Sequence, residues 1–198
     1  MNHLLIFIKN PIKGEVKTRL AATVGDDEAL RIYLELLKHT RNIAAQVDAQ
    51  RNVFYAHFIN EEDEWNRSDF DKHVQINGDL GEKMAAGFEA VFEKKARKAV
   101  IIGSDCASLT TDIINTAFAK LDTHDFVIGP ADDGGYYLIG MKEFSPEIFQ
   151  NIEWSTEKVF SQTLDIITNN NKTCGLLPTL SDIDYEEDWI KYGWQITS

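Results

Sequence analysis

Residues 99–105 read Ala-Val-Ile-Ile-Gly-Ser-Asp, and the first five of them, 99–103, form the clearest strand expected in the chain. A short apolar run of mostly β-branched residues that ends at glycine is typical of a strand inside a sheet. The next apolar residues, over 110–121, fall at helical spacing. A strand followed directly by a helix is the unit from which parallel sheets are built. This stretch therefore predicts an α/β fold.

The same alternation continues in both directions along the chain. It predicts a mostly parallel sheet covered by helices on both faces. Because no repeat, linker or low-complexity stretch interrupts it, we expect one domain over residues 1–198. The further strand-like segments are 3–9, 52–59, 73–76, 126–129, 136–141 and 173–177, and the further helix-like segments are 26–47, 79–92, 156–167 and 186–192.

The composition excludes several classes of protein. Of the 198 residues, 43% are hydrophobic and 26% are charged, which is typical of a globular chain. The apolar runs are far shorter than the roughly 18 residues of a membrane span, so we expect no membrane span. The net charge of −12 argues against a nucleic-acid polymer as partner, because the chain would repel its phosphates.

Cysteine usage and the N-terminus bear on the cellular compartment. Cys106 and Cys174 are too few for a disulfide framework or a cysteine-based zinc site. No secretory signal is visible at the start of the chain. We therefore expect a cytoplasmic protein with free thiols. The sequence gives no stripe of exposed apolar residues from which an oligomeric state could be argued.

The loops that follow the strands are the candidate sites, because ligands of parallel sheets bind beyond the carboxyl ends of the strands. The first of these loops, residues 9–20, holds four cations and one anion in an acidic chain. Lysine and arginine there form a candidate cradle for phosphate groups. Val16 stands where a Walker A loop needs glycine, so the loop is not of that type. The alternative interpretation is a solvated basic turn.

The second loop places Asp105 two residues beyond the strand at 99–103, where a carboxylate would face a ligand. A hard oxygen ligand at this position suits Mg²⁺ or Mn²⁺ held together with substrate phosphates. The alternative is that Asp105 or Ser108 caps the turn or the next helix. We interpret Cys106 as a small buried thiol, because no histidine near it in sequence could activate it.

The third loop has paired carboxylates followed by paired glycines, Asp132 to Gly135. Gly134 and Gly135 allow either a positive φ or the close approach of a ligand to the backbone. A tight hairpin turn is the simpler interpretation, since Asp-Gly is a strong turn signal. Further along, Trp154 is the one tryptophan that we expect to line a pocket.

The fourth feature is an acidic run, in which five of the seven residues from Asp182 to Asp188 are carboxylates. Clustered carboxylates repel one another and favour a bound cation. The last three precede an apolar pattern and fit an acidic helix start. Asp182 and Asp184 come before that helix and are the better candidates for metal ligands.

Taken together, these segments resemble the DUF2064-type bacterial glycosyltransferase-like group of the GT-A (nucleotide-diphospho-sugar transferase) superfamily. The resemblance covers essentially the whole chain from Lys9 to Trp189. Two positions depart from the family pattern: Lys83 stands where arginine is usual, and Ala107 where proline is usual. The matching stretches are KxP at 9–11, GxVKTRL at 14–20, QINGDLGEKM at 75–84, IGSD at 102–105, GPADDGGYYLIG at 129–140, WST at 154–156 and DIDxExD at 182–188.

The resemblance implies a three-layer α/β/α sandwich with a nucleotide pocket at the strand ends, similar also to guanylyl-type nucleotidyltransferases. Carried over by position, Lys17 and Arg19 would hold the nucleotide phosphates. Asp105 would be the first ligand of a Mg²⁺ or Mn²⁺ cofactor. Asp184 or Asp182 would be the second.

The resemblance also implies roles for the other matching positions. Gln75 and Gly78 would lie near the base or the sugar, and Asp133 near the acceptor. We expect Asp105, Asp133 and Lys17 to be the catalytic residues. The expected nucleotide-binding residues are Lys9, Gly14, Lys17, Thr18, Arg19, Gln75, Gly78, Lys83, Gly134, Gly135 and Trp154.

The function expected from these residues is metal-dependent transfer from an activated nucleotide donor to a small-molecule acceptor, with glycosyl transfer from a nucleotide-diphospho-sugar favoured. Such transfer needs positioning and charge neutralisation more than a protein nucleophile. One alternative is a nucleotidyltransferase that joins a nucleoside triphosphate to a phosphorylated acceptor. Another is a non-catalytic nucleotide-binding protein. A phosphatase or P-loop ATPase is disfavoured, since the motifs of both are absent.

Overall fold

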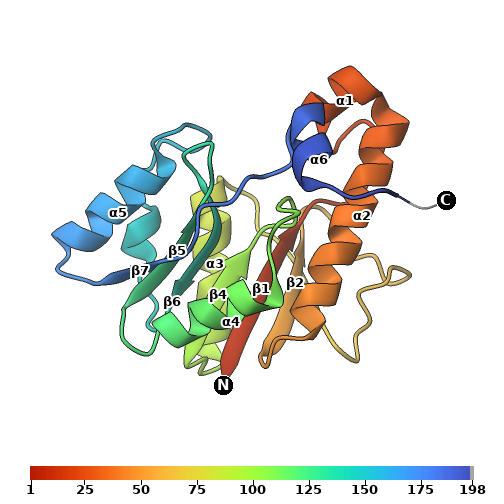
Figure 1. The fold of residues 1–198 in the computed structure, drawn as a ribbon. Coiled ribbons are helices and arrows are strands. Elements are labelled where there is room, and N and C mark those ends of the chain that lie inside the picture. Colours follow the sequence, from red (N-terminus) through yellow and green to blue (C-terminus); the bar gives the residue numbers. More distant parts are fainter. Residues whose placement is uncertain (197–198) are drawn as a thin grey trace.

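The structure is a computed structural model that describes residues 1–196, with a seven-stranded sheet at its centre (Figure 1). Helices cover both faces of the sheet, which confirms the predicted three-layer α/β/α sandwich. The strands are β1 (Asn2–Ile8), β2 (Gln50–Tyr55), β3 (Asp71–Val74), β4 (Lys98–Ile102), β5 (Phe126–Pro130), β6 (Tyr136–Met141) and β7 (Cys174–Leu176). The helices are α1 (Thr18–Val24), α2 (Asp26–Ala45), α3 (Leu80–Glu93), α4 (Thr111–Lys120), the 3₁₀ helix η1 (Pro146–Phe149), α5 (Val159–Asn169) and α6 (Glu186–Tyr192).

The sheet has the strand order β3-β2-β1-β4-β6-β5-β7. Strand β6 is antiparallel to both of its neighbours, β4 and β5, and the remaining pairs are parallel. The predicted mostly parallel sheet is therefore confirmed. Residues 131–135 connect β5 to β6 as a hairpin, as the paired glycines there suggested.

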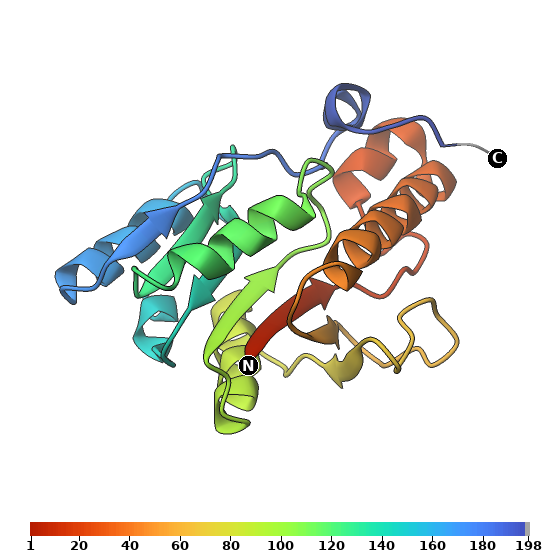
Figure 2. The same cartoon turned by 60° about the horizontal axis from the view of Figure 1, so that its bottom comes forward.

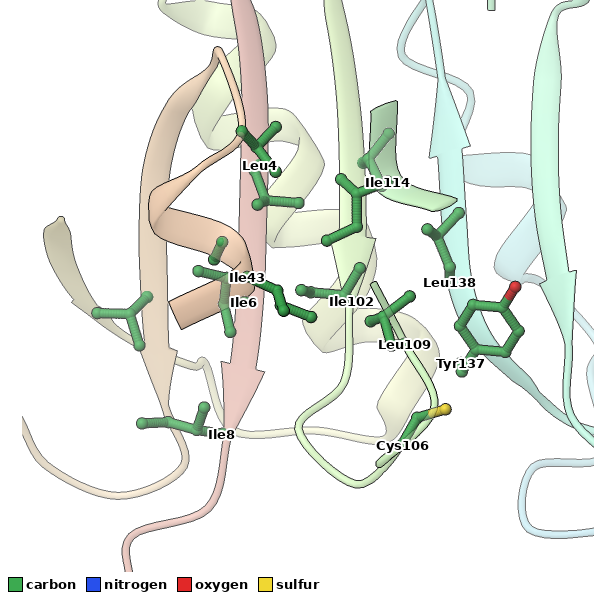
Figure 3. Packing of buried hydrophobic residues seen from close by; sticks show 14 of the residues in the cluster. Leu4, Ile6, Ile8, Ile43, Ile102, Cys106, Leu109, Ile114, Tyr137 and Leu138 are labelled. Atoms are coloured by element: carbon green, nitrogen blue, oxygen red, sulfur yellow. The ribbon is translucent and has the colours of Figure 1, made fainter. Parts of the chain in front are cut away.

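Each face of the sheet has its own hydrophobic core. From β1, Leu4 and Ile6 pack with residues of α2 and α4 on one face (Figure 3). Leu5, between them, packs on the other face with α3, η1 and α5. Figure 2 shows α2 and α4 on the same side of the sheet. Because both faces are covered, the central strands are buried throughout and read as continuous apolar runs.

The helices differ from expectation mainly at their starts. Helix α1 was not predicted: it spans seven residues, has no side-chain N-cap and buries only Leu20, so it leaves no periodic pattern in the sequence. Helix α5 begins at Val159 rather than at residue 156. Within residues 1–196, no helix is both long and apolar enough to cross a membrane.

The segment after β7 crosses the carboxyl ends of the strands on its way to α6, which lies beside α1 (Figures 1 and 2). Backbone hydrogen bonds fix it along the way. The N–H of Leu180 donates to the carbonyl of Pro130 at 3.1 Å, and the N–H of Ile183 donates to the carbonyl of Asp105 at 2.9 Å. We call this segment, residues 177–185, the C-terminal strap. It delivers the acidic residues 182 and 184 to the loop after β4.

Close packing inside the sheet makes Gly140 of β6 a test of this architecture. A Cβ atom there would lie 2.8 Å from Val100 Cγ2 and 2.9 Å from Val127 Cγ1. We expect Gly140→Ala to lower the free energy of unfolding by about 1–3 kcal/mol, because overpacking forces neighbours to shift. Urea denaturation measures this. Gly103→Ala is the matched control with no atom within 4 Å of the added carbon, so equal losses in both variants would contradict the packing.

Candidate functional site

The loops after β1 and β4 are joined by one buried tyrosine of α2. Tyr33 accepts a hydrogen bond from the N–H of Lys9 at 2.9 Å and donates to the carbonyl of Lys9 at 3.1 Å. Its hydroxyl also lies 3.2 Å from Ser104 Oγ. Burial raises the pKa of Tyr33 far above its usual value, and the negative charge of Asp105 adds to the rise. The hydroxyl therefore stays protonated and holds the two loops in register.

Lys17 lies at the centre of the site, with a side chain only 5% exposed. Its Nζ donates to the carbonyl of Ile183 at 2.7 Å and lies 3.0 Å from Asp105 Oδ1. The same Nζ is 3.8 Å from Asp184 Oδ1. Lys17 adopts a left-handed backbone conformation with φ 49°, which is costly for a residue with a Cβ atom. The loop after β1, the loop after β4 and the C-terminal strap thus meet at one ammonium group.

Arg19, in the first turn of α1, completes the ion-pair network. Its guanidinium donates to Asp184 Oδ2 at 2.9 Å, with 64% of the Arg19 side chain exposed. The two predicted metal ligands, Asp105 and Asp184, therefore converge as expected. They pair with Lys17 and Arg19, the two cations that were predicted to hold phosphates. The sequence did not indicate this pairing.

Asp182 carries the most perturbed carboxylate of the site. Its pKa is raised from 3.8 to about 7, first by burial and then by the nearby charge of Asp105. Lys17 acts in the opposite direction, while Asp133 and Asp184 again raise the pKa. The negative charges of the three neighbouring acids therefore outweigh the positive charge of Lys17 in their combined effect on Asp182.

Two cavities open on either side of Asp105, and both are lined by Lys9, Val16 and Asp105. The larger, about 520 Å³, is mostly apolar; the smaller, about 350 Å³, is mostly polar. The larger is lined by Phe7, Ile8, Lys9, Asn10, Glu15, Val16, Ala56, His57, Gln75, Leu80, Lys83, Met84, Ile101, Gly103, Ser104, Asp105, Cys106, Tyr136, Tyr137, Leu138, Ile139 and Asp182. The smaller is lined by Lys9, Val16, Lys17, Thr18, Arg19, Tyr33, Asp105 and Asp184.

Two amides fix the walls of the larger cavity. Gln75 Nε2 donates to the carbonyls of Ile8 and Phe54 at 3.2 and 3.0 Å, which joins the ends of β1 and β2. Asn10, 2% exposed, accepts from the N–H of His57 at 2.9 Å and donates to the carbonyl of Phe58 at 2.9 Å. Asn10 lies within the loop 9–20 but is not among the residues predicted to form the site. Its sole signal was its place directly after a strand.

Several predicted binding residues have a packing role and do not line either cavity. Gly78 comes just before Asp79, whose side chain forms a capping box with Glu82 at the start of α3. A Cβ atom at Gly78 would collide with that Glu82 side chain. Trp154 packs against Gly81 and so fixes the same helix start. A ligand contact of Gly78 or Trp154 stays a prediction.

The hairpin glycines behave in a similar way. Gly134 has a positive φ of 86°, and a Cβ atom there would collide with the backbone of Glu157. Gly134 therefore permits the backbone of Glu157, rather than a ligand, to approach closely. Asp133 accepts a hydrogen bond from the N–H of Gly135 at 2.8 Å, which closes the turn. Gly14 also has a positive φ, 82°, in the loop after β1.

Cys106 is a buried thiol, as expected, and lies in the loop after β4 (Figure 3). Burial raises its pKa to about 12, with a further contribution from Asp182. A thiol with this pKa is protonated at neutral pH and is a poor nucleophile. Covalent catalysis by this residue is therefore disfavoured.

The donor chemistry of the site fits a hard divalent cation. Asp105 and Asp184 each direct a carboxylate oxygen at one point, the Nζ of Lys17. Mg²⁺ is typically bound through one or two carboxylates together with substrate phosphates. Within residues 1–196, no group of three His, Cys, Asp or Glu side chains is arranged to hold a metal ion. Asp105 and Asp184 thus fit a metal site that has two carboxylate ligands and is completed by a substrate.

Comparison with known proteins gives one family. The family model described as "Uncharacterized protein conserved in bacteria (DUF2064)" matches residues 39–156, more than half of the chain. The matched region includes Gln75, Asp105 and the hairpin of β5 and β6. No curated protein matches the chain.

A solved structure from Desulfovibrio desulfuricans G20, provisionally assigned as a nucleotide-diphospho-sugar transferase, is similar over nearly the whole chain. It is 29% identical, covers 93% of this chain and 82% of its own, and has a TM-score of 0.86. More distant structures share the fold alone. CMP:2-keto-3-deoxy-manno-octonic acid synthetase complexed with CTP is 10% identical over 96% and 95% of the two chains, with a TM-score of 0.58. Rv0371C of Mycobacterium tuberculosis H37Rv, complexed with manganese, is 10% identical over 98% of each chain, with a TM-score of 0.57.

The raised pKa of Asp182 predicts a pH-dependent loss of stability. Between pH 3.8 and about pH 7, the folded state keeps a proton on Asp182 that the unfolded state has released. Unfolding then releases a proton, so stability falls as pH rises through this window. Asp182→Asn removes this component. We expect the wild type to lose stability relative to the variant between about pH 4 and 7.

Urea denaturation at a series of pH values measures the difference between the two proteins. The comparison cancels the titration of other groups, such as the buried His3 and the partly buried His73, whose pKa values are lowered by burial. A difference that does not change with pH would show that Asp182 is ionised in the folded protein.

Proposed function

Because the chain belongs to the DUF2064 family, we propose that it is a metal-dependent transferase that uses a nucleotide-activated donor, most of all a nucleotide-diphospho-sugar. The similarity to the transferase-like structure from Desulfovibrio desulfuricans G20 supports this proposal. So does the fold, which is shared with a CTP-bound synthetase. The catalytic unit in this proposal is one domain over residues 1–198.

The observation that carries the proposal is the position of Asp105 between two cavities of different character. The base of a nucleotide is a flat ring system with apolar faces and polar edges, and it suits the larger, mostly apolar cavity. A diphosphate suits the smaller cavity, where Lys17 and Arg19 lie. A donor that spans both cavities would place its phosphates directly beside Asp105.

The metal in this proposal is Mg²⁺ or Mn²⁺, held by Asp105 and by Asp184 or Asp182. A bound divalent ion would neutralise charge on the phosphate oxygens of the leaving group. The manganese complex of a protein with the same fold supports such a metal.

The chain's own residues then bind and orient the donor. Lys9 and Lys83 line the larger cavity and can attract the phosphates, while Lys17 and Arg19 can hold them. Asp133 lies close enough to raise the pKa of Asp182, which is consistent with a role near the acceptor. No protein nucleophile is needed, because transfer of this kind depends on position and charge.

Nucleotidyl transfer from a nucleoside triphosphate is the second candidate function. The loop over residues 9–20 carries four cations, enough for a third phosphate. The two reactions place a diphosphate against the same residues and differ in what leaves. A nucleotide-sugar leaves behind a nucleoside diphosphate, whereas a triphosphate releases pyrophosphate.

Thermal unfolding with a panel of nucleoside triphosphates and nucleotide-sugars, each with and without Mg²⁺ or Mn²⁺, tests the proposal. At a hundredfold excess over Kd, a true donor raises Tm by about 5–10 °C for a chain of this size. Asp105→Asn should abolish the part of this shift that depends on metal. Asp165→Asn, an exposed position on α5, is the matched control and should keep the whole shift.

Stabilisation by a nucleotide-sugar supports glycosyl transfer, and stabilisation by a triphosphate alone supports nucleotidyl transfer. Binding that needs no metal and leads to no turnover would support a non-catalytic nucleotide-binding protein. A metal-dependent shift that survives in Asp105→Asn would overturn the role of Asp105.

A further inference from the structure

We propose that the site neutralises itself when no ligand is bound, so that the metal and the donor phosphates each bind more tightly together than alone. In this state the predicted phosphate-binding cations are paired with the predicted metal-binding acids. The inference rests on the proposed function and adds a regulation of that same site. It follows from the ion pairs that Lys17 and Arg19 form with Asp105 and Asp184. Each of these ion pairs can be removed by a single substitution.

The first contact is that of Lys17. Its Nζ is 3.0 Å from Asp105 Oδ1 and 3.8 Å from Asp184 Oδ1. The two carboxylates therefore already share one cation. A divalent ion that approached them would meet an ammonium group at the place where it must bind, and like charges at this distance repel strongly in a partly buried site. Lys17 must turn away before the metal can bind.

The second contact is that of Arg19. Its guanidinium donates to Asp184 Oδ2, so this carboxylate is held from both of its oxygens. A phosphate group that approached Arg19 alone would have to replace Asp184. It would then lie beside a carboxylate that has lost a partner, and two anions would face each other.

Both costs disappear when the two ligands arrive together. The metal takes the place of the cations on Asp105 and Asp184, and the phosphates take the place of the acids on Lys17 and Arg19. Each charged group exchanges one partner of opposite charge for another, so none is left unpaired in a half-buried site. By linkage, whatever the metal contributes to phosphate binding, the phosphate contributes equally to metal binding.

Two cations of the larger cavity remain available to attract a ligand. Within residues 1–196, neither Lys9 nor Lys83 has an ion-pair partner, and both line that cavity. A metal–nucleotide complex can therefore be drawn toward the cavity before the pairs around Lys17 exchange.

The first test titrates Mn²⁺ alone, with no nucleotide present, and follows free Mn²⁺ by electron paramagnetic resonance. We expect Lys17→Met to bind Mn²⁺ about tenfold tighter than the wild type, and Arg19→Gln about fivefold tighter, within the usual range of coupling between sites. Asp165→Asn should match the wild type. Arg19 is exposed, so Arg19→Gln keeps the test valid if Lys17→Met does not fold.

The second test titrates inorganic pyrophosphate in the presence of a metal chelator, by calorimetry. Asp184→Asn releases Arg19 and removes one acid, so we expect it to bind metal-free pyrophosphate about fivefold tighter than the wild type. A residue that only helped to build the site would weaken binding when replaced. The predicted gain is therefore the distinguishing sign.

The outcomes separate the inference from the proposed function. If the wild type binds a metal–nucleotide complex but Lys17→Met, Arg19→Gln and Asp184→Asn show no gain with the single ligands, the inference is wrong and the proposed function stands. If the wild type binds no nucleotide with any metal, while the three gains are observed, the proposed function is wrong and the self-neutralised state remains.

Discussion

A single ammonium group holds the candidate site together. Lys17 Nζ contacts the carbonyl of Ile183 and the carboxylates of Asp105 and Asp184, which belong to two segments that are distant in sequence. The backbone of Ile183 in turn donates to the carbonyl of Asp105. Ile183 itself is fully buried in a small core between α1, α2 and the strap. Polar contacts and apolar burial thus fix the same few atoms.

The rest of the site depends on buried residues whose polar groups form hydrogen bonds to the protein itself. Tyr33 holds the loop after β1 against the loop after β4, and Asn10 holds the segment after β2. These groups leave the side chains of the loops free to define two cavities of opposite polarity. The sheet places the loops at the carboxyl ends of its strands, and the buried hydrogen bonds fix the position of each loop there. This division between scaffold and loops is common where function lies at the ends of parallel strands.

Much of the fold could be predicted because burial on both faces leaves a strong signal. The apolar runs of β1, β4 and β5 and the helical spacing of α2, α3 and α4 were visible in the sequence. The place of Asp105 followed from the rule that ligands bind at the ends of strands. Helix α1 escaped prediction because its seven residues carry almost no buried face.

The sequence pointed to charged residues that lie together in the structure, but not to how they pair. Charge and position along the chain pointed to Lys17, Arg19, Asp105 and Asp184. The sequence does not show whether a cation is free to bind a ligand or is already paired with a neighbouring acid. That depends on distances set by tertiary contacts. The role of Tyr33 was missed for a different reason. Tyr33 belongs to the apolar pattern of α2, and that pattern does not show that its hydroxyl forms hydrogen bonds with the loops. Gly134 was expected to allow a positive φ or the close approach of a ligand; it has the positive φ, and the group that approaches it closely is the backbone of Glu157.

The strap also has a consequence for how the protein comes to be made. Lys17 and Ile183, which touch in the finished site, are separated by 166 positions in sequence. A ribosome produces the first of them long before the second, and closing so long a loop is entropically slow. The nascent chain can build most of the sheet while Lys17 and Arg19 still lack Asp184, which follows only in the strap. The contacts of Asp184 with Lys17 and Arg19 are therefore among the last contacts of the site that can form during synthesis.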